Sequence, residues 1–133
     1  AVRIKNKEDL RRYGIAKVTP VEGNVFKIEK IVEKPEPDEA PSDLAAHGAY
    51  ILPPEIIGIL KKQKPSKDGE IALPVAIDAL IKTGYPVYAC EIENGKYYDT
   101  GNKIEYLKTV VEFGLMHKDI NGEFRKFLKG LNL

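Results

Sequence analysis

The pattern of apolar residues divides the chain into a first third rich in strand-like runs and a remainder with helical spacing. The run formed by Val25, Ile28 and Ile31-Val32 is typical of a mostly buried strand. Glu22-Gly23-Asn24 precedes it as a hairpin-type turn. The same type of pattern predicts strands at residues 15–19, 25–32, 44–52 and 87–92.

Helices are predicted over most of the remaining chain. Residues 104–116 and 119–131 each carry an apolar stripe at helical spacing. Earlier in the chain, Pro53-Pro54 begins a helix, since proline is tolerated in a first turn. Asp68-Gly69-Glu70 opens another helix, and Pro74 falls within its first turns. Early strands followed by helices predict an α/β fold with a mixed sheet.

Nucleotide binding would require a part that this sequence does not contain. A doubly wound fold that binds nucleotides carries a glycine-rich phosphate loop in its first βα unit. The sequence has neither GxGxxG nor GxxxxGK(S/T). Either the protein binds no nucleotide, or the nucleotide-binding part lies upstream of Ala1. The start in what reads as mid-strand favours the second interpretation.

Composition limits the classes of partner. The 133 residues are 43% hydrophobic and 31% charged, which fits one domain or part of a larger one. A net charge of +1 gives no reason to expect nucleic acid or an anionic membrane as partner. No apolar run approaches the ~20 residues that span a bilayer, and the start lacks a signal-peptide core, so we expect a cytoplasmic protein. The single cysteine, Cys90, excludes an intrachain disulfide.

Glu33 and Lys34 are candidate binding residues because they stand where a predicted strand leaves the core. Pro35 favours extended geometry at Lys34. A carboxylate can accept hydrogen bonds from vicinal sugar hydroxyls, and an ammonium can neutralise a phosphate. A sugar phosphate offers both partners side by side. The alternative is a surface ion pair beside a turn, which contributes little.

Two other positions are open to more than one interpretation. Gly14 either relaxes a bend or lets a ligand approach the backbone. The run Asp99-Thr100-Gly101-Asn102 follows a predicted Asn94-Gly95 hairpin turn and resembles a strand end before a helix cap. Taken alone, Asp99 would be assigned as that cap.

Five short runs occur in a specific order, although each alone is weakly specific. They are Arg12-Tyr13-Gly14, Ile31-Val32-Glu33-Lys34-Pro35, Gly48-Ala49-Tyr50-Ile51-Leu52, Gly69-Glu70-Ile71 and Tyr98-Asp99-Thr100-Gly101-Asn102-Lys103. Together they resemble the C-terminal half of prokaryotic UTP–glucose-1-phosphate uridylyltransferases, also called UDP-glucose pyrophosphorylases. The Asn102-Lys103 pair favours this branch over the related thymidylyltransferases, which are the alternative within the class.

The resemblance implies a Rossmann-like nucleotidyltransferase fold and a Mg²⁺-dependent enzyme. Its reaction would transfer UMP from UTP to glucose 1-phosphate and give UDP-glucose and pyrophosphate. By resemblance, Glu33 would bind glucose hydroxyls and Lys34 the sugar-side phosphate, as a catalytic residue. Gly14 would lie against the sugar, and Gly48 would keep that wall of the pocket thin. Asp99 would be a catalytic magnesium ligand.

The resemblance also has gaps. The family's glycine-rich loop and its first magnesium aspartate have no counterpart, so we expect residues 1–133 to be a C-terminal sugar-phosphate-binding part, inactive alone. Ala72, Pro74 and Val75 replace polar residues usual in the family, so no site role is expected for that helix. A half-sheet would leave open strand edges, which favours a homo-oligomer. The competing interpretations are a non-catalytic sugar-nucleotide-binding or regulatory module, and a purely structural piece.

Overall fold

The computed structural model describes residues 1–66 and 69–131. The chain forms two compact units, Ala1–Asn94 and Gly95–Leu133, which are called here the first and second units. The first unit contains a sheet with two α-helices, and the second contains two further α-helices. Asp68, expected to open a helix, lies outside the described residues. No helix in the described part of the chain is long and apolar enough to cross a membrane.

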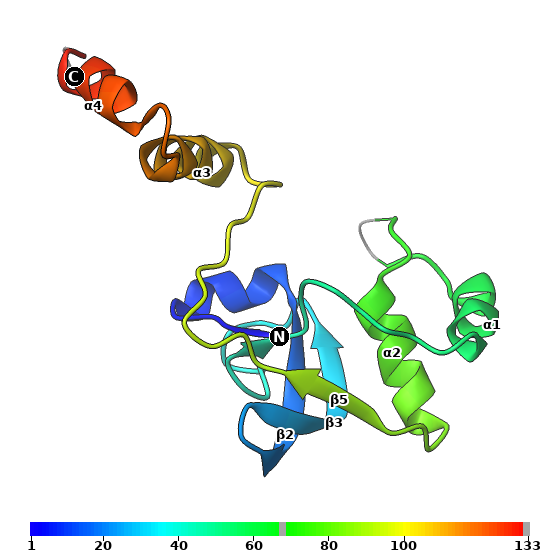
Figure 1. Ribbon diagram of the computed structural model, residues 1–133. Helices are drawn as coiled ribbons and strands as arrows, with labels where there is room; N and C mark the ends of the chain where they lie inside the picture. Colours follow the sequence, from blue (N-terminus) through cyan, green and yellow to red (C-terminus); the bar gives the residue numbers. More distant parts are fainter. Residues whose placement is uncertain (67–68, 132–133) are drawn as a thin grey trace. The chain divides into compact units, whose positions relative to one another are not determined.

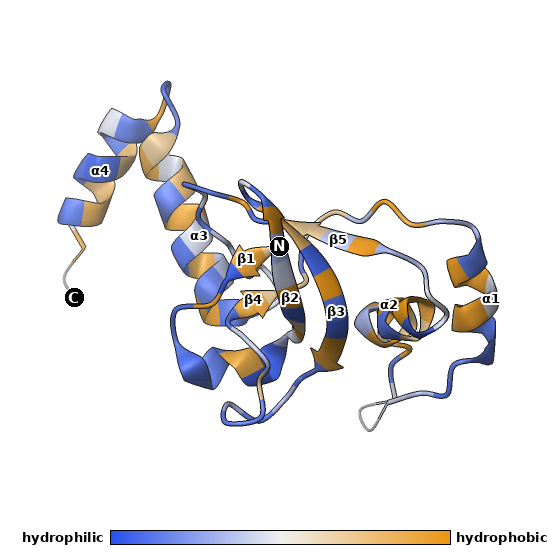
Figure 2. Cartoon of the chain, turned by 90° about the horizontal axis from the view of Figure 1, so that it is seen from below, coloured by the Kyte–Doolittle hydropathy of each residue, from blue (hydrophilic) through white to orange (hydrophobic). Residues whose placement is uncertain are grey.

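The first unit is built on a five-stranded sheet with the order β1-β4-β2-β3-β5 (Figures 1 and 2). All of the strand pairs in this sheet are antiparallel. A 3₁₀ helix, Lys7–Arg12, follows β1, and the side chain of Asn6 caps it by accepting the Glu8 N–H. The strands are β1 Val2–Arg3, β2 Gly14–Glu22, β3 Val25–Glu33, β4 Leu44–Ala45 and β5 Val87–Cys90. The predicted α/β class is confirmed, but the described strands pair only antiparallel and not in the mixed sheet that the sequence analysis expected.

The hairpin of β2 and β3 forms the centre of this sheet. Gly23, with φ +53°, occupies the turn between the strands, where a left-handed conformation favours glycine. The strand β2 continues through Pro20 to Glu22, beyond the end predicted for it. The register shifts between Pro20 and Glu22, and a proline is tolerated at such an irregularity because it has no N–H to donate.

Two helices of the first unit follow the predicted order. They are α1, Glu55–Lys62, and α2, Leu73–Lys82. The helix α2 begins later than expected, with Pro74 in its first turn. It packs against β3, where hydrophobic and hydrophilic residues alternate (Figure 2). The buried core includes Ala16, Ile28, Ile31, Leu44, Ala46, Ile56, Ala76, Ile77, Leu80 and Ala89.

The strand predicted at residues 44–52 is mostly absent. Only Leu44–Ala45 pairs as a strand, and residues 46–52 form no strand. A strand requires a neighbour to complete its hydrogen bonds, and no other described strand lies beside this segment. The prediction of a strand over residues 44–52 is therefore wrong beyond Ala45.

The second unit consists of α3, Lys103–Met116, and α4, Asn121–Lys129. The side chain of Asn102 caps α3 by accepting the N–H groups of Ile104 and Glu105 at 3.0 and 3.2 Å. No strand precedes this cap within residues 95–102, so the predicted hairpin at Asn94-Gly95 is reduced to a turn. A side chain at Gly114 would collide with the Phe124 ring at 2.7 Å, which shows that the helices pack closely there.

A buried carboxylate joins α2 to the sheet. The strand β5 pairs with β3 only from Val25 to Ile28, so the edge of β3 is open beyond that point. Asp78, which is 7% exposed, accepts the Ile31 N–H on this edge at 2.9 Å. Its other oxygen lies 2.6 Å from Nζ of Lys82, whose side chain is 70% exposed. The carboxylate therefore completes a backbone hydrogen bond that no strand supplies.

Replacing Asp78 by Ala should lower the free energy of unfolding by about 1–3 kcal/mol, because the buried Ile31 N–H loses its acceptor. Asp78→Asn keeps an acceptor oxygen and should cost less. Lys82→Ala removes only an exposed ion-pair partner and should cost at most ~1 kcal/mol. Urea denaturation at pH 7 measures all three. Equal losses for Asp78→Ala and Lys82→Ala would show that the Ile31 hydrogen bond is unimportant.

Candidate functional site

Three segments far apart in the sequence converge where β2 begins and β3 ends. Gly14 and Glu33 are directly opposite each other in the β2–β3 register. The Lys34 N–H donates to the Tyr13 carbonyl at 3.0 Å, and the Ala46 N–H donates to the Gly14 carbonyl at 2.8 Å. Gly48 follows two residues after Ala46. The structure thus brings the regions of four predicted residues, Gly14, Glu33, Lys34 and Gly48, to one corner of the sheet.

Gly14 leaves no room for a side chain. A Cβ built on it would lie 2.8 Å from Cβ of Pro74 and 3.0 Å from Oε2 of Glu33. That oxygen is itself buried. The glycine therefore lets a carboxylate and the start of α2 approach the same stretch of backbone. The helix predicted to have no part in the site borders it through Pro74.

The conformation at Lys34 differs from the extended geometry predicted from Pro35. Its φ is +46°, in the left-handed region that a non-glycine residue rarely adopts. Such a conformation costs on the order of 1–3 kcal/mol and persists where the surroundings enforce it. Here β3 ends, Pro35 is buried behind it and Lys34 is exposed. The Lys34 N–H bond to Tyr13 helps to fix this turn.

Tyr50 is a member of this corner that the sequence analysis did not single out. Its hydroxyl donates to the Ala46 carbonyl at 2.7 Å. Burial raises the pKa of Tyr50, and the negative charge of Glu33 raises it further, so the phenol stays protonated as a donor. The rings of Tyr13 and His47 make an edge-to-face contact with centroids 5.6 Å apart. The sequence analysis noted the run of residues 48–52 that contains Tyr50, but only the fold shows that Tyr50 lies near Glu33.

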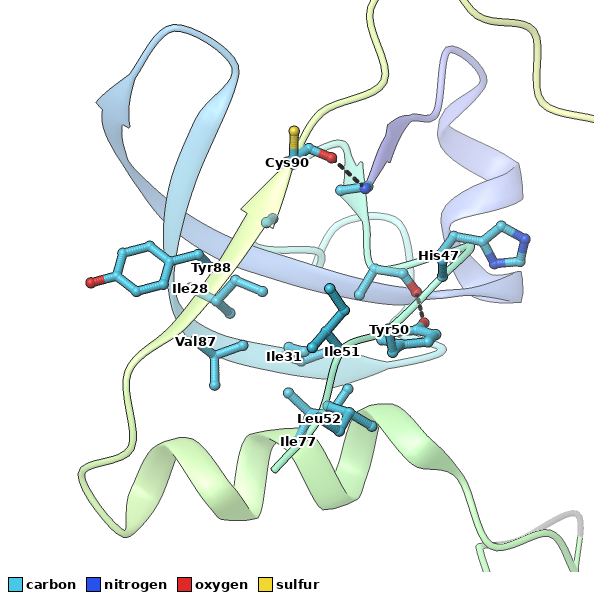
Figure 3. A pocket seen from close by; sticks show the side chains of 14 residues that line it. Ile28, Ile31, His47, Tyr50, Ile51, Leu52, Ile77, Val87, Tyr88 and Cys90 are labelled. Carbon is cyan, nitrogen blue, oxygen red and sulfur yellow. Dashed lines mark hydrogen bonds between the residues drawn. The ribbon is translucent and has the colours of Figure 1, made fainter. Parts of the chain in front are cut away.

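An apolar pocket of about 270 Å³ lies in the first unit (Figure 3). Residues from β3, β5, α2 and the segment 46–52 line it, with His47 and Tyr50 among them. Gly14, Glu33, Lys34 and Gly48 are not part of this lining. The pocket therefore adjoins the predicted corner without containing its charged residues.

Asp99 belongs to the second unit, where it shapes the turn before α3. Its Oδ1 accepts the N–H groups of Gly101 and Asn102 at 3.1 and 3.3 Å. The residue that caps the helix is Asn102, so the alternative assignment of Asp99 as the cap is wrong. Among the described residues, no cluster of three or more His, Cys, Asp or Glu side chains could hold a metal ion.

A charged cluster supports the segment that carries Asp99. Glu112 accepts a hydrogen bond from the Lys96 ammonium and another, at 3.2 Å, from the Tyr98 hydroxyl. Lys96 lies over the Tyr98 ring, and Tyr98 packs edge-on against Phe113 with centroids 5.1 Å apart. The hydrogen bond from Lys96 is the main cause that lowers the pKa of Glu112. These contacts fix Tyr98 against α3 one residue before Asp99.

The first unit and most of α3 match a known family model. The model for the nucleotidyl transferase family covers residues 1–114, and the chain belongs to that family. Its curated relatives include UTP–glucose-1-phosphate uridylyltransferase 2 of Streptococcus pyogenes serotype M3, 41% identical over 123 residues. A UTP–glucose-1-phosphate uridylyltransferase of Streptococcus pneumoniae is 40% identical over 122 residues. Both alignments cover 91% of this chain, which spans 40% of the length of these relatives.

Solved structures agree with this assignment. A UDP-glucose pyrophosphorylase complexed with UDP-glucose has a TM-score of 0.77 and 33% identity, covering 84% of this chain and 42% of that chain. A UTP-bound enzyme of the same kind from Acinetobacter baumannii has a TM-score of 0.76 and 33% identity, covering 98% of this chain and 44% of that one. The resemblance inferred from the five short runs is confirmed.

Gly14→Ala should lower the free energy of unfolding by about 1–3 kcal/mol, because the new methyl group must displace Pro74 or Glu33. Gly58→Ala is the matched control, since Gly58 lies within α1 and a Cβ there meets no atom within 4 Å. The control should be neutral or stabilising by up to ~1 kcal/mol. Urea denaturation compares the two. Equal effects would mean that the Gly14 contact is easily relieved.

The pKa of Glu112 should lie below its ordinary value of 4.5 and rise toward that value in Lys96→Met. A lowered pKa means that the carboxylate stabilises the second unit above the ordinary pKa. This stabilisation is lost as pH falls through the folded-state pKa. Carboxyl chemical shifts followed by NMR during a pH titration measure it. Lys108→Met, which removes the weakest of the attractive charges, should change the pKa least.

Proposed function

We propose that this chain is the sugar-phosphate part of an enzyme that transfers UMP from UTP to glucose 1-phosphate. The products are UDP-glucose and pyrophosphate. The observation that carries the proposal is the convergence of Gly14, Glu33 and Lys34 at the ends of β2 and β3. These three residues occur in the runs that resemble the uridylyltransferases, and relatives of that name match 91% of this chain.

Glu33 is suited to bind the hexose. An ionised carboxylate accepts hydrogen bonds from two neighbouring hydroxyl groups, which orients a sugar ring. Gly14 allows the ligand and the carboxylate to share the same stretch of backbone because it has no side chain. Gly48, with φ +99°, turns the chain near this corner without placing a side chain there. Tyr50, near Glu33, is a further candidate donor to a hydroxyl group.

Lys34 is suited to neutralise the sugar-side phosphate. Its left-handed backbone turns the chain out of β3, and the side chain is exposed beside Glu33. In phosphoryl transfer, catalysis consists mostly of positioning and neutralisation of charge. An ammonium next to the attacking phosphate oxygen would hold two anions together during the in-line displacement at the α-phosphorus. The neighbouring carboxylate and ammonium would then bind the two ends of one substrate.

Asp99 is proposed as a ligand of Mg²⁺. Mg²⁺ is held by one or two carboxylates together with substrate phosphates and water, so a single carboxylate fits this mode of binding. The N–H groups of Gly101 and Asn102 orient the Asp99 carboxylate, and the Lys96–Tyr98–Glu112 cluster supports the segment before it. The ion would neutralise charge on the phosphates of UTP.

The groups that bind UTP would come from a region that this chain does not match. The chain spans 40% of the length of its uridylyltransferase relatives, and the described residues include no glycine-rich phosphate loop. We therefore expect that the 133 residues alone release no pyrophosphate from UTP and glucose 1-phosphate. The complete enzyme would act on soluble metabolites, as a homo-oligomer in the cytoplasm.

The role of Lys34 can be tested in a chimera, in which this chain replaces the matching region of the Streptococcus pyogenes relative. Lys34→Ala should raise KM for glucose 1-phosphate by roughly 10–100-fold, because a charge-assisted contact contributes about 1.5–3 kcal/mol. Steady-state pyrophosphate release measures the change.

Lys61→Ala is the matched control, since Lys61 is an exposed lysine of α1 away from this corner. It should leave KM within about twofold of the unmodified chimera, as expected for a surface charge. Equal effects of the two substitutions would remove Lys34 from the site. A Lys34→Ala chimera with unchanged KM for glucose 1-phosphate and unchanged kcat would argue against the proposed reaction geometry.

A further inference from the structure

The loop that follows β4 reaches two sides of the corner formed by Gly14, Glu33 and Lys34. The Tyr50 hydroxyl donates to the Ala46 carbonyl at 2.7 Å, and this bond closes the loop on itself. The negative charge of Glu33 contributes to the raised pKa of Tyr50, so that carboxylate lies near the Tyr50 end of the loop. The Glu33 side of the corner is therefore bordered by Tyr50.

His47 lies on the other side of the same loop. Its partly buried imidazole meets the Tyr13 ring edge to face, with centroids 5.6 Å apart. The Tyr13 carbonyl in turn accepts the Lys34 N–H at 3.0 Å. Figure 3 shows the imidazole turned away from Ile51 and from the other aliphatic side chains of the pocket. His47 thus contacts the residue that fixes Lys34.

The Tyr13 ring that contacts His47 is itself held in place. The Arg12 guanidinium lies over this ring, 5.8 Å from its centroid, and cation–π contacts of this kind are attractive. Arg12 also donates to the Asp9 carboxylate at 3.3 Å. The imidazole therefore packs against a fixed neighbour. A side chain that is ordered before a ligand arrives loses less entropy when the ligand binds.

We propose that His47 is a second hydrogen-bond donor to the sugar-side phosphate, beside Lys34. This inference rests on the proposed function and extends it to a residue outside the five runs. A neutral imidazole carries one N–H group and a protonated one carries two, so the ring donates in either state. The Lys34 ammonium acts as a point charge, whereas the N–H of a fixed ring also orients the phosphate. The hexose would then lie toward Glu33 and Tyr50.

The alternative is that His47 only packs against Tyr13. Two substitutions separate these roles. His47→Phe keeps an aromatic ring for the edge-to-face contact but removes the N–H donor. His47→Asn keeps a donor but removes the ring. A donor role predicts the larger loss of ligand affinity for His47→Phe, and a packing role predicts it for His47→Asn.

The experiment is isothermal titration calorimetry on the chimera with the Streptococcus pyogenes relative. UDP-glucose is one probe because it contains the sugar-side phosphate, and UTP is the other because it contains no phosphate from glucose 1-phosphate. His47→Phe should weaken UDP-glucose binding roughly tenfold and leave UTP binding within about twofold. His117→Phe is the matched control at the second histidine, which ends α3, and should leave both affinities within about twofold.

An NMR titration of the unmodified chimera gives a second readout that needs no variant to fold. Addition of UDP-glucose should shift the imidazole signals of His47, with those of His117 as an internal reference. Unshifted His47 signals would overturn the proposal. Equal affinities of the His47→Phe and His117→Phe chimeras, or a larger loss for His47→Asn than for His47→Phe, would also overturn it.

Lys34→Ala in the same titrations separates this inference from the proposed function. If Lys34→Ala weakens UDP-glucose binding and His47→Phe does not, only the role of His47 is wrong. If neither substitution changes the affinity, the placement of the sugar-side phosphate at this corner fails together with it.

Discussion

The antiparallel pairing of β2 with β3 is the constraint on which the rest of the first unit depends. It sets Gly14 opposite Glu33 at one end of the hairpin, and it presents β3 to β5 and α2 along the other edge. A shift of one residue in this register would turn the buried side chains of β3 away from the core. Asp78 supports the pairing by accepting the Ile31 N–H where β5 no longer covers β3. The β2–β3 pairing thus positions the sheet and the candidate site, and α2 is joined to it through core packing and Asp78.

The corner at Gly14 concentrates features that oppose stability. A left-handed lysine and a half-buried carboxylate lie within a few residues of the sheet end, where Gly14 leaves no room for a side chain. The lysine conformation and the carboxylate burial each cost free energy, and such costs are tolerated where a ligand or a packed surrounding compensates for them. Tyr50, with its raised pKa, belongs to the same corner as a protonated donor. This concentration is why we place the sugar phosphate here and not in the apolar pocket beside it.

The pocket beside this corner has a different character. The lining is mainly aliphatic, and Glu33 and Lys34 are not part of it. The two regions adjoin through His47 and Tyr50, which line the pocket.

The sequence by itself determined the fold class, the order of the elements and the family. Apolar periodicity is a local signal that survives without a tertiary partner, whereas the N-cap of α3 is Asn102 and not Asp99. Only the tertiary structure decided that residues 44–52 pair as a strand over just two residues, that Lys34 is left-handed, and that Tyr50 lies near Glu33 and Pro74 near Gly14. Each of these depends on contacts between segments distant in sequence, and hydrogen-bond partners and steric neighbours of that kind leave no trace in a local pattern.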